Sequence, residues 1–525
     1  MKSRLSYFLA SGIIILSIFI GIFIWHHQHH QEASNFKEKS FTAPISSKYI
    51  PTNADLVLHW KVNPSILPEY IENYQDRVNK NIVNRKVKLI RDSTFRLISL
   101  DFTKEISSFS GGYGSFGIFE SNNQLLDDWL MVLEINKDIN IDEELESISD
   151  PKIIDQNINT INNLNPKKLK LFSKKITSDL SIYFLNNKEH ILISSNPKLI
   201  KSSILNLENN ILSTKEKYKN IQLKDNVNDG FFLLELSPKK ILNLIGQKNY
   251  LLGIDQTDKL ISSVNIENKQ LTFEGILSYN IRHKRPINDL NYDFNDIENE
   301  FNSFDSFILI NNAKQYFGKY SRHPYQKSIA SIIEKSTSKD NSKLFKIILK
   351  NTNGNFIWLK DKDWLAITRK IDTDKKEINK ILEKDKFSNS NLEFKNKILE
   401  VWSKITTDTN EEYKIKENIE AITEENKDVY IWSQDLSSIS NFDNKKYSLN
   451  SIDSENENND FDDVIKIHLG KERTELFLND FYPYILLRTM LGNKLDFPQT
   501  LDISMAIPAI NYPDFVKFKI NLKTS

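Results

Sequence analysis

The residues nearest to a cofactor or catalytic motif lie in the segment GYGSFG, where Gly112, Gly114 and Gly117 have the spacing GxGxxG. In a dinucleotide site this spacing follows a strand and opens a helix, whose N-terminus holds the pyrophosphate. The residues after Gly117 instead predict a strand, a turn and another strand, so we interpret the glycines as a turn or as points of close backbone packing. Ser115 does not form a nucleophile elbow, because Tyr113 stands where that motif requires glycine.

Four histidines form the better of two candidate metal sites: His26, His27, His29 and His30. Neighbouring neutral imidazoles can share a zinc, copper or nickel ion. Glu32 is the only carboxylate beside them, so a polar collar at the edge of a membrane is the favoured interpretation and a metal site is the weak alternative.

The other candidate metal site is the acidic run DSENENNDFDD, with Asp453, Glu455, Glu457, Asp460, Asp462 and Asp463. It lacks the glycine and the terminal glutamate of an EF-hand loop, so we predict a solvated loop. The chain has no cysteine, which excludes disulfides, thiol catalysis and thiolate metal sites. The sequence therefore predicts no cofactor, no resident metal and no enzymatic activity.

A basic cluster between Arg77 and Arg96 is the most suggestive surface feature, since it holds seven basic residues and one acid, Asp92. On a helix, Arg85, Lys88 and Arg91 share one face because they are three residues apart. Such a face can dock onto anionic lipid headgroups, with each basic residue contributing ~1 kcal/mol. The alternative is a packed helix whose basic face is simply solvated.

The segment from Tyr7 to Trp25 is 19 residues long and carries no charge. At ~1.5 Å per residue it reaches roughly 28 Å, about the hydrocarbon thickness of a bilayer. Lys2 and Arg4 precede it, and Lys37 is the next basic residue after it. The positive-inside bias therefore predicts a retained single-pass anchor with a cytoplasmic N-terminus and an exported body in the periplasm or thylakoid lumen.

The remaining length predicts two units, because 525 residues exceed what one core usually supports. A strand, helical spacing, further strands and a closing hairpin occur once from Asp55 to Tyr279 and again from Ser306 to Leu522. We predict an α+β fold of two similar halves, each an antiparallel sheet covered by helices. The expected division is an anchor at 1–25, a linker at 26–47 and halves at 48–283 and 284–525.

Five segments carry a family resemblance: YIPTNADLVLHWKVNP, LDFTKEISSFSGGYGSFGIFE, WLMVLEINKD, HILISSNPKLIKSSI and GFFLLELSPKKIL. They resemble a mostly cyanobacterial family called domain of unknown function 3352. The family pattern begins with one membrane segment and covers most of the exported part. The resemblance implies no activity, because its motifs consist of apolar and turn residues.

Charge and motifs together favour an interaction protein. The 70 basic and 70 acidic residues give a net charge of zero, which argues against nucleic acid as a partner. We expect a membrane-tethered, non-catalytic interaction or scaffold protein, whose partners are the membrane, anionic lipid headgroups or other membrane proteins. A carrier or chaperone for lipids or other apolar ligands is the alternative, and an enzyme comes third.

Overall fold

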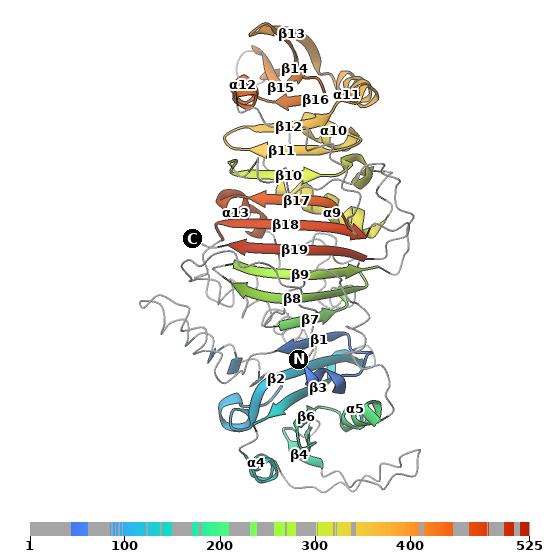
Figure 1. Cartoon of the computed structure of the whole chain (residues 1–525), viewed down its shortest axis with the longest axis vertical. Coiled ribbons are helices and arrows are strands. Elements are labelled where there is room, and N and C mark those ends of the chain that lie inside the picture. The colour runs from blue at the N-terminus through green and yellow to red at the C-terminus, as the bar shows by residue number, and fades with distance from the viewer. Residues whose placement is uncertain are drawn as a thin grey trace.

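The computed structural model describes these residues of the chain: 44–60, 85, 88–89, 91–92, 95–96, 98–121, 124–136, 139–149, 171–177, 181–208, 232–238, 257–267, 270–279, 301, 303–318, 321, 323–337, 343–408, 414–444, 461–479, 481, 498–508 and 515–523. They form a mixed helix and sheet structure built on one 19-stranded antiparallel sheet. Figure 1 shows the strands stacked as a ladder along the longest axis of the molecule.

The middle of the sheet is the pair β9 (Gln270–Ser278) and β19 (Phe515–Lys523), which runs antiparallel from Ser278 opposite Phe515 to Gln270 opposite Lys523. Outward from β9 the strands are β8 (Lys259–Glu267), β7 (Phe232–Leu236), β1 (Leu56–Trp60), β2 (Ser110–Ser121), β3 (Gln124–Ile135), β6 (His190–Ser194), β5 (Ser181–Asn186) and β4 (Leu171–Lys175).

Outward from β19 the strands are β18 (Thr500–Pro508), β17 (Phe461–Leu469), β10 (Ser306–Ile310), β11 (Phe356–Lys360), β12 (Trp364–Arg369), β16 (Val429–Ser433), β15 (Lys414–Glu425), β14 (Lys397–Asp408) and β13 (Ser388–Phe394). Strand for strand, this order repeats that on the β9 side, and β13 is an addition at the outer end.

One face of the sheet, here called the core face, carries an apolar core that runs along its whole length. Alternating positions supply it, for example Leu58 of β1, Ile308 of β10 and Met505 of β18. Among the described residues, five helices contribute to this core or pack against strands beneath it: α4 (Ile141–Ile148), α9 (Pro324–Ser336), α10 (Lys343–Asn351), α11 (Asp372–Lys384) and α13 (Lys471–Asn479). The core face therefore makes the sheet one packed body.

The opposite face, here called the second face, has two separate apolar clusters. The cluster around Val57 and Leu192 packs under α5 (Pro197–Glu208) and the short helical turn η1 (Ile45–Tyr49). The cluster around Leu309 and Ile431 packs under α12 (Leu436–Asn444). In Figure 1, α5 and α12 lie toward opposite ends of the ladder.

Most predicted strands are present, but the expected pair of sheets is one continuous sheet because β9 and β19 pair edge to edge. The sequence analysis also missed β4 and the three outermost strands β13, β14 and β15. The prediction of a loop for the acidic run is wrong at its end, where residues 461–463 begin β17. Their register with β18 shifts between Asp463 and Ile465, so the strand starts irregularly.

Candidate functional site

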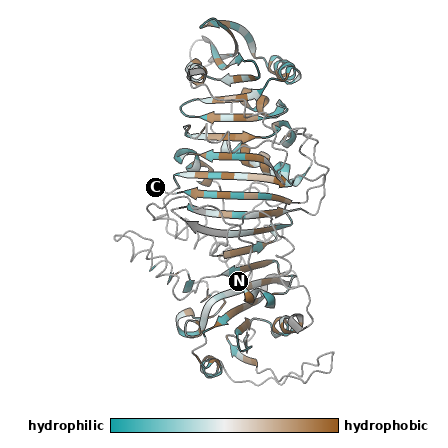
Figure 2. Ribbon diagram, in the orientation of Figure 1, coloured by the Kyte–Doolittle hydropathy of each residue, from teal (hydrophilic) through white to brown (hydrophobic). Residues whose placement is uncertain are grey.

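The central polar surface is the part of the second face between the two apolar clusters, and it is our candidate site. Its residues are Thr272, Glu274, Lys466, His468, Asp502, Ser504, Lys517, Lys519 and Asn521, from β9, β17, β18 and β19. The sequence builds it by strict alternation, as in β18, where half-buried Asp502 and Ser504 alternate with buried Leu501, Ile503 and Met505. Figure 2 shows this alternation of polar and apolar residues along the central strands.

One row of the surface crosses all four strands. His468 pairs with Asp502, Asp502 with Asn521, and Asn521 with Thr272. The His468 Nδ1 and Asp502 Oδ1 atoms lie 2.6 Å apart, and Thr272 Oγ1 donates a hydrogen bond of 2.9 Å to Asn521 Oδ1. The His468 ring also stacks on Phe307 of β10, with 5.3 Å between ring centroids. These contacts link the row across the β9–β19 junction.

A second row places lysines beside a carboxylate. Lys466 pairs with Ser504, Ser504 with Lys519, and Lys519 with Glu274. Burial raises the pKa of Glu274, while Lys519 and Lys517 act in the opposite direction. Three lysines against Glu274 and Asp502 give these nine residues a basic excess.

A buried polar cluster lies on the second face beside the apolar cluster around Val57 and Leu192, and the sequence analysis did not anticipate it. Ser115 Oγ is 2.7 Å from His59 Nδ1 and 2.7 Å from Ser46 Oγ. All three side chains are fully buried. A nucleophilic serine must reach substrate, so this arrangement fastens η1 to β1 and β2 and does not form an active site. Ser115 is 69 positions from Ser46 and 56 from His59, so no local motif links the three residues.

A buried lysine near the other end of the sheet has a strongly perturbed environment. Lys375 of α11 places its Nζ atom 4.2 Å from the ring centre of Trp432, 5.1 Å from that of Tyr430 and 2.5 Å from Glu400 Oε2. Burial lowers the pKa of Lys375, although the hydrogen bond and charge of Glu400 oppose this effect. Because the Nζ atom is sealed from solvent, we interpret the residue as one that packs α11 onto the sheet.

The glycines of the GxGxxG segment lie inside β2, and β3 follows, which confirms the strand, turn and strand interpretation. Gly114 faces Trp60 so closely that a Cβ atom there would lie 2.1 Å from Trp60 Cζ2. The backbone N–H of Gly112 donates to Glu134 Oε2 at 3.2 Å. The spacing thus serves close packing, and no helix follows that would receive a pyrophosphate.

The predicted lipid-binding residues differ in their surroundings. Residues 85, 88 and 91 are helical, and Arg85 and Lys88 are exposed. Arg91 is only 11% exposed; its guanidinium lies 4.1 Å from the ring centre of Phe102 and 2.8 Å from Asp92 Oδ1. Arg91 therefore packs against the body, whereas Arg85 and Lys88 are available to a surface.

The four N-terminal histidines lie outside the described residues, as do Asp453, Glu455, Glu457, Asp460 and the predicted anchor from Tyr7 to Trp25. Within the described part of the chain, no helix is long and apolar enough to cross a membrane. Nor do the residues described there include three or more histidine, aspartate or glutamate side chains grouped to hold a metal ion.

Comparison with protein families shows to which family the chain belongs. A family model described as a protein of unknown function, DUF3352, matches residues 8–523. The chain belongs to this family. The match confirms the resemblance that the sequence motifs indicate, and it extends through the β10–β19 region, where those motifs are weakest. No curated protein and no solved structure matches the chain.

Proposed function

We propose that this DUF3352 protein is a membrane-tethered, exported, non-catalytic interaction or scaffold protein whose partner binds the central polar surface. The observation that carries the proposal is the uneven covering of the second face. Among the described residues, helices and apolar clusters occupy its two ends, while the centre presents half-buried polar side chains. A rigid polar area on a packed sheet suits recognition of another macromolecule, because its groups are already ordered before binding.

The repeated strand order supports a second part of the proposal, that residues 48–283 and 284–525 are two similar halves. Each half then contributes β7 to β9 or β17 to β19 to the middle of the sheet. The central polar surface is built across their junction, with Thr272 and Glu274 from one half and Asp502 and Lys519 from the other. Binding at this place requires both halves in register.

The charge of the surface suggests the chemistry of the partner. The surface combines Lys466, Lys517 and Lys519 with Glu274 and Asp502, so a partner that presents complementary charged and polar groups is favoured. The predicted anchor places this surface beside a membrane, where Arg85 and Lys88 add a contact to anionic headgroups. A carrier of lipids or other apolar ligands is the alternative function.

Site-specific photo-crosslinking tests the proposal in membranes of cells that make the full chain. A photoreactive residue at Asn521 is expected to give a discrete protein adduct, and the same residue at exposed Glu143 of α4 is expected to give none. Lys517→Glu with Lys519→Glu is expected to abolish the Asn521 adduct at unchanged protein level. Absence of the adduct, or its survival in the double variant, contradicts the proposal. Lipids that cross-link at Asn521 in place of protein favour the carrier.

A further inference from the structure

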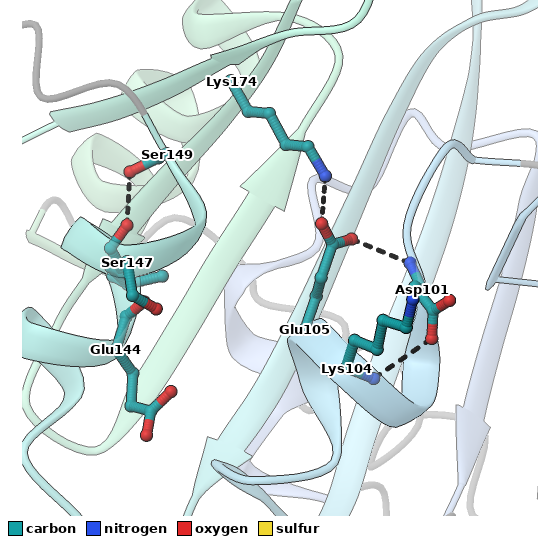
Figure 3. Close-up of polar contacts among 8 residues, drawn as sticks. Asp101, Lys104, Glu105, Glu144, Ser147, Ser149 and Lys174 are labelled. Carbon is teal, nitrogen blue, oxygen red and sulfur yellow. Dashed lines mark hydrogen bonds and ion pairs between the residues drawn. The ribbon is translucent and has the colours of Figure 1, made fainter.

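The two outer edges of the sheet are protected to different degrees. At one end, Leu171 and Phe172 of β4 are buried, and α4 packs against β4 and β5. Figure 3 shows that Lys174 of β4 reaches Glu105, which lies in the short helical turn η2 (Phe102–Ile106). The other carboxylate oxygen of Glu105 accepts a hydrogen bond of 2.8 Å from the Asp101 N–H. Covering and lysines are the usual means by which proteins prevent edge strands from pairing.

The β13 edge is less protected, although α11 packs against β13. Its residues Ser388 to Glu393 are all exposed, and Phe394 is half-buried. The strand contains no lysine and no proline, and among the described residues no other strand pairs with its outer side. Lys395 and Asn396 both have positive φ, as a tight two-residue hairpin turn requires, so β13 is held firmly on β14.

Exposed apolar residues gather at the same end. Seven large apolar side chains are exposed among the described residues, and four of them lie on β13, β14 and β15: Leu392, Ile398, Ile405 and Ile419. Ile398 is 73% exposed and Ile405 is 58% exposed. Such a concentration beside an open edge strand is typical of an interaction surface.

We propose that β13 pairs antiparallel with β13 of a second copy of this chain, so that two sheets join into one. An extended backbone edge is recognised by another strand through main-chain hydrogen bonds. The chain already joins two strand sets in this way at β9 and β19. Because antiparallel pairing of β13 with its own copy uses the same surface on both chains, it closes a two-fold dimer and does not continue into a filament.

The sequence of β13 is complementary to itself in this arrangement. With Asn391 on the two-fold axis, Ser390 faces Leu392 of the second copy, and Asn389 faces Glu393. The one charged residue of the strand, Glu393, therefore never faces its own copy, and like charges directly opposite each other are avoided. The two Leu392 side chains become diagonal neighbours on the same face, ~7–8 Å apart, which shields apolar surface from water.

A single introduced cysteine tests the geometry, because the chain has none of its own. In full-length protein purified in detergent, Asn391→Cys is expected to form a disulfide-linked dimer under mild oxidation, since paired residues in adjacent strands have Cα atoms ~4.5–5.5 Å apart. Lys362→Cys, in the exposed turn between β11 and β12, is the matched control and is expected to remain monomeric on a non-reducing gel.

A charge change tests the association itself. Wild-type full-length protein is expected to sediment with the mass of two chains, and Asn391→Lys, which sets two lysines opposite each other, with the mass of one. Thr406→Lys, at an exposed site on β14, keeps the dimer. Thermal unfolding of both variants is expected to match wild type, because both sites are exposed. A monomeric wild type, or a dimer that survives Asn391→Lys, overturns the proposal.

Discussion

The β1–β2 pair and the β10–β11 pair occupy the same place in the strand order, but their sequences fill it differently. Trp60 faces Gly114 across the first pair, whereas Ile310 faces Phe356 across the second. One position along, His59 faces Ser115 in the first pair, and Leu309 faces Ile357 in the second.

The two pairs keep the same strand order and the same core positions, but different combinations of residues fill those positions. In the first pair, large Trp60 on β1 lies opposite Gly114 on β2, which has no side chain. In the second pair, Ile310 and Phe356 share the volume between the two strands. The polar pair His59 and Ser115 is accommodated because Ser46 of η1 contacts it. Packing density and hydrogen-bond satisfaction constrain the pair of residues, and neither residue is constrained by itself.

The largest effect that tests this comparison is expected from Gly114→Ala. Its Cβ atom would lie 2.1 Å from Trp60 Cζ2, so the indole or the strand must move. We expect a loss of about 3 kcal/mol in the free energy of unfolding, measured by urea denaturation. Adding Trp60→Ile, which copies Ile310, is expected to recover much of the loss.

Gly112→Ala is the matched control, since it lies in the same strand and the same GxGxxG segment. Its new Cβ atom would meet only Glu134 Oε2, at 3.9 Å, which is an ordinary contact. If Gly112→Ala and Gly114→Ala have the same free energy of unfolding, the match of a large residue on β1 with a glycine on β2 does not contribute to stability.

An intermediate effect is expected from Ser115→Ala. The substitution removes the hydroxyl that contacts both His59 and Ser46 in a fully buried place, and we expect a loss of about 2 kcal/mol by urea denaturation. The triple variant Ser46→Ala, His59→Leu, Ser115→Ala makes the first pair apolar like the second. It is expected to be more stable than Ser115→Ala, because the three polar groups of the cluster are then removed together.

Ser110→Ala is the control for a buried serine in β2, because within the described part of the chain its hydroxyl makes just one long hydrogen bond, 3.4 Å to the carbonyl of Gly111. If this variant loses as much stability as Ser115→Ala, the hydrogen bonds to His59 and Ser46 do not explain the effect.

The smallest effect concerns the helices that follow the two strand pairs, α4 after β3 and α11 after β12. The fourth residue of α4 is half-buried Glu144, and that of α11 is buried Lys375. Lys375→Met keeps the apolar contacts with Trp432, so we expect a stability change near neutral pH within about 1 kcal/mol. Urea denaturation of the variant measures it.

The pH dependence of stability isolates the charge of Lys375. Its folded-state pKa lies below the ordinary 10.5, so the folded protein binds fewer protons than the unfolded chain between the two values. Wild-type stability is therefore expected to rise relative to Lys375→Met as the pH increases toward 10.5. Lys376→Met, at the exposed neighbouring position, is the control. A constant difference between wild type and Lys375→Met over this range contradicts the assigned burial.

Elements with strong apolar periodicity could be predicted from the sequence. Runs such as LVLHW, HILISS and SFILIN predict buried strands, and the hairpin of β8 and β9 follows from two apolar runs around residues 267–269. Family membership was likewise indicated by short motifs and is shown by the family match. These features are local, since each depends on residues close together in the chain.

Strands β13 and β15 escaped prediction because their sequences do not show one buried face. SNSNLEF is exposed on both sides, and KIKENIEAITEE is rich in charged residues. The pattern of apolar residues identifies a strand only where burial selects one side. At the edge of the sheet that selection is weak.

Contacts between distant parts of the chain could not be predicted from the sequence. Thr272 and Asn521 are 249 positions apart, and Ser46 and Ser115 are 69 apart, yet each pair is hydrogen-bonded. The central polar surface exists because β9 and β19 pair in one particular register. A strand's own sequence tells which of its faces is apolar, but it does not tell which distant strand will satisfy its backbone hydrogen bonds.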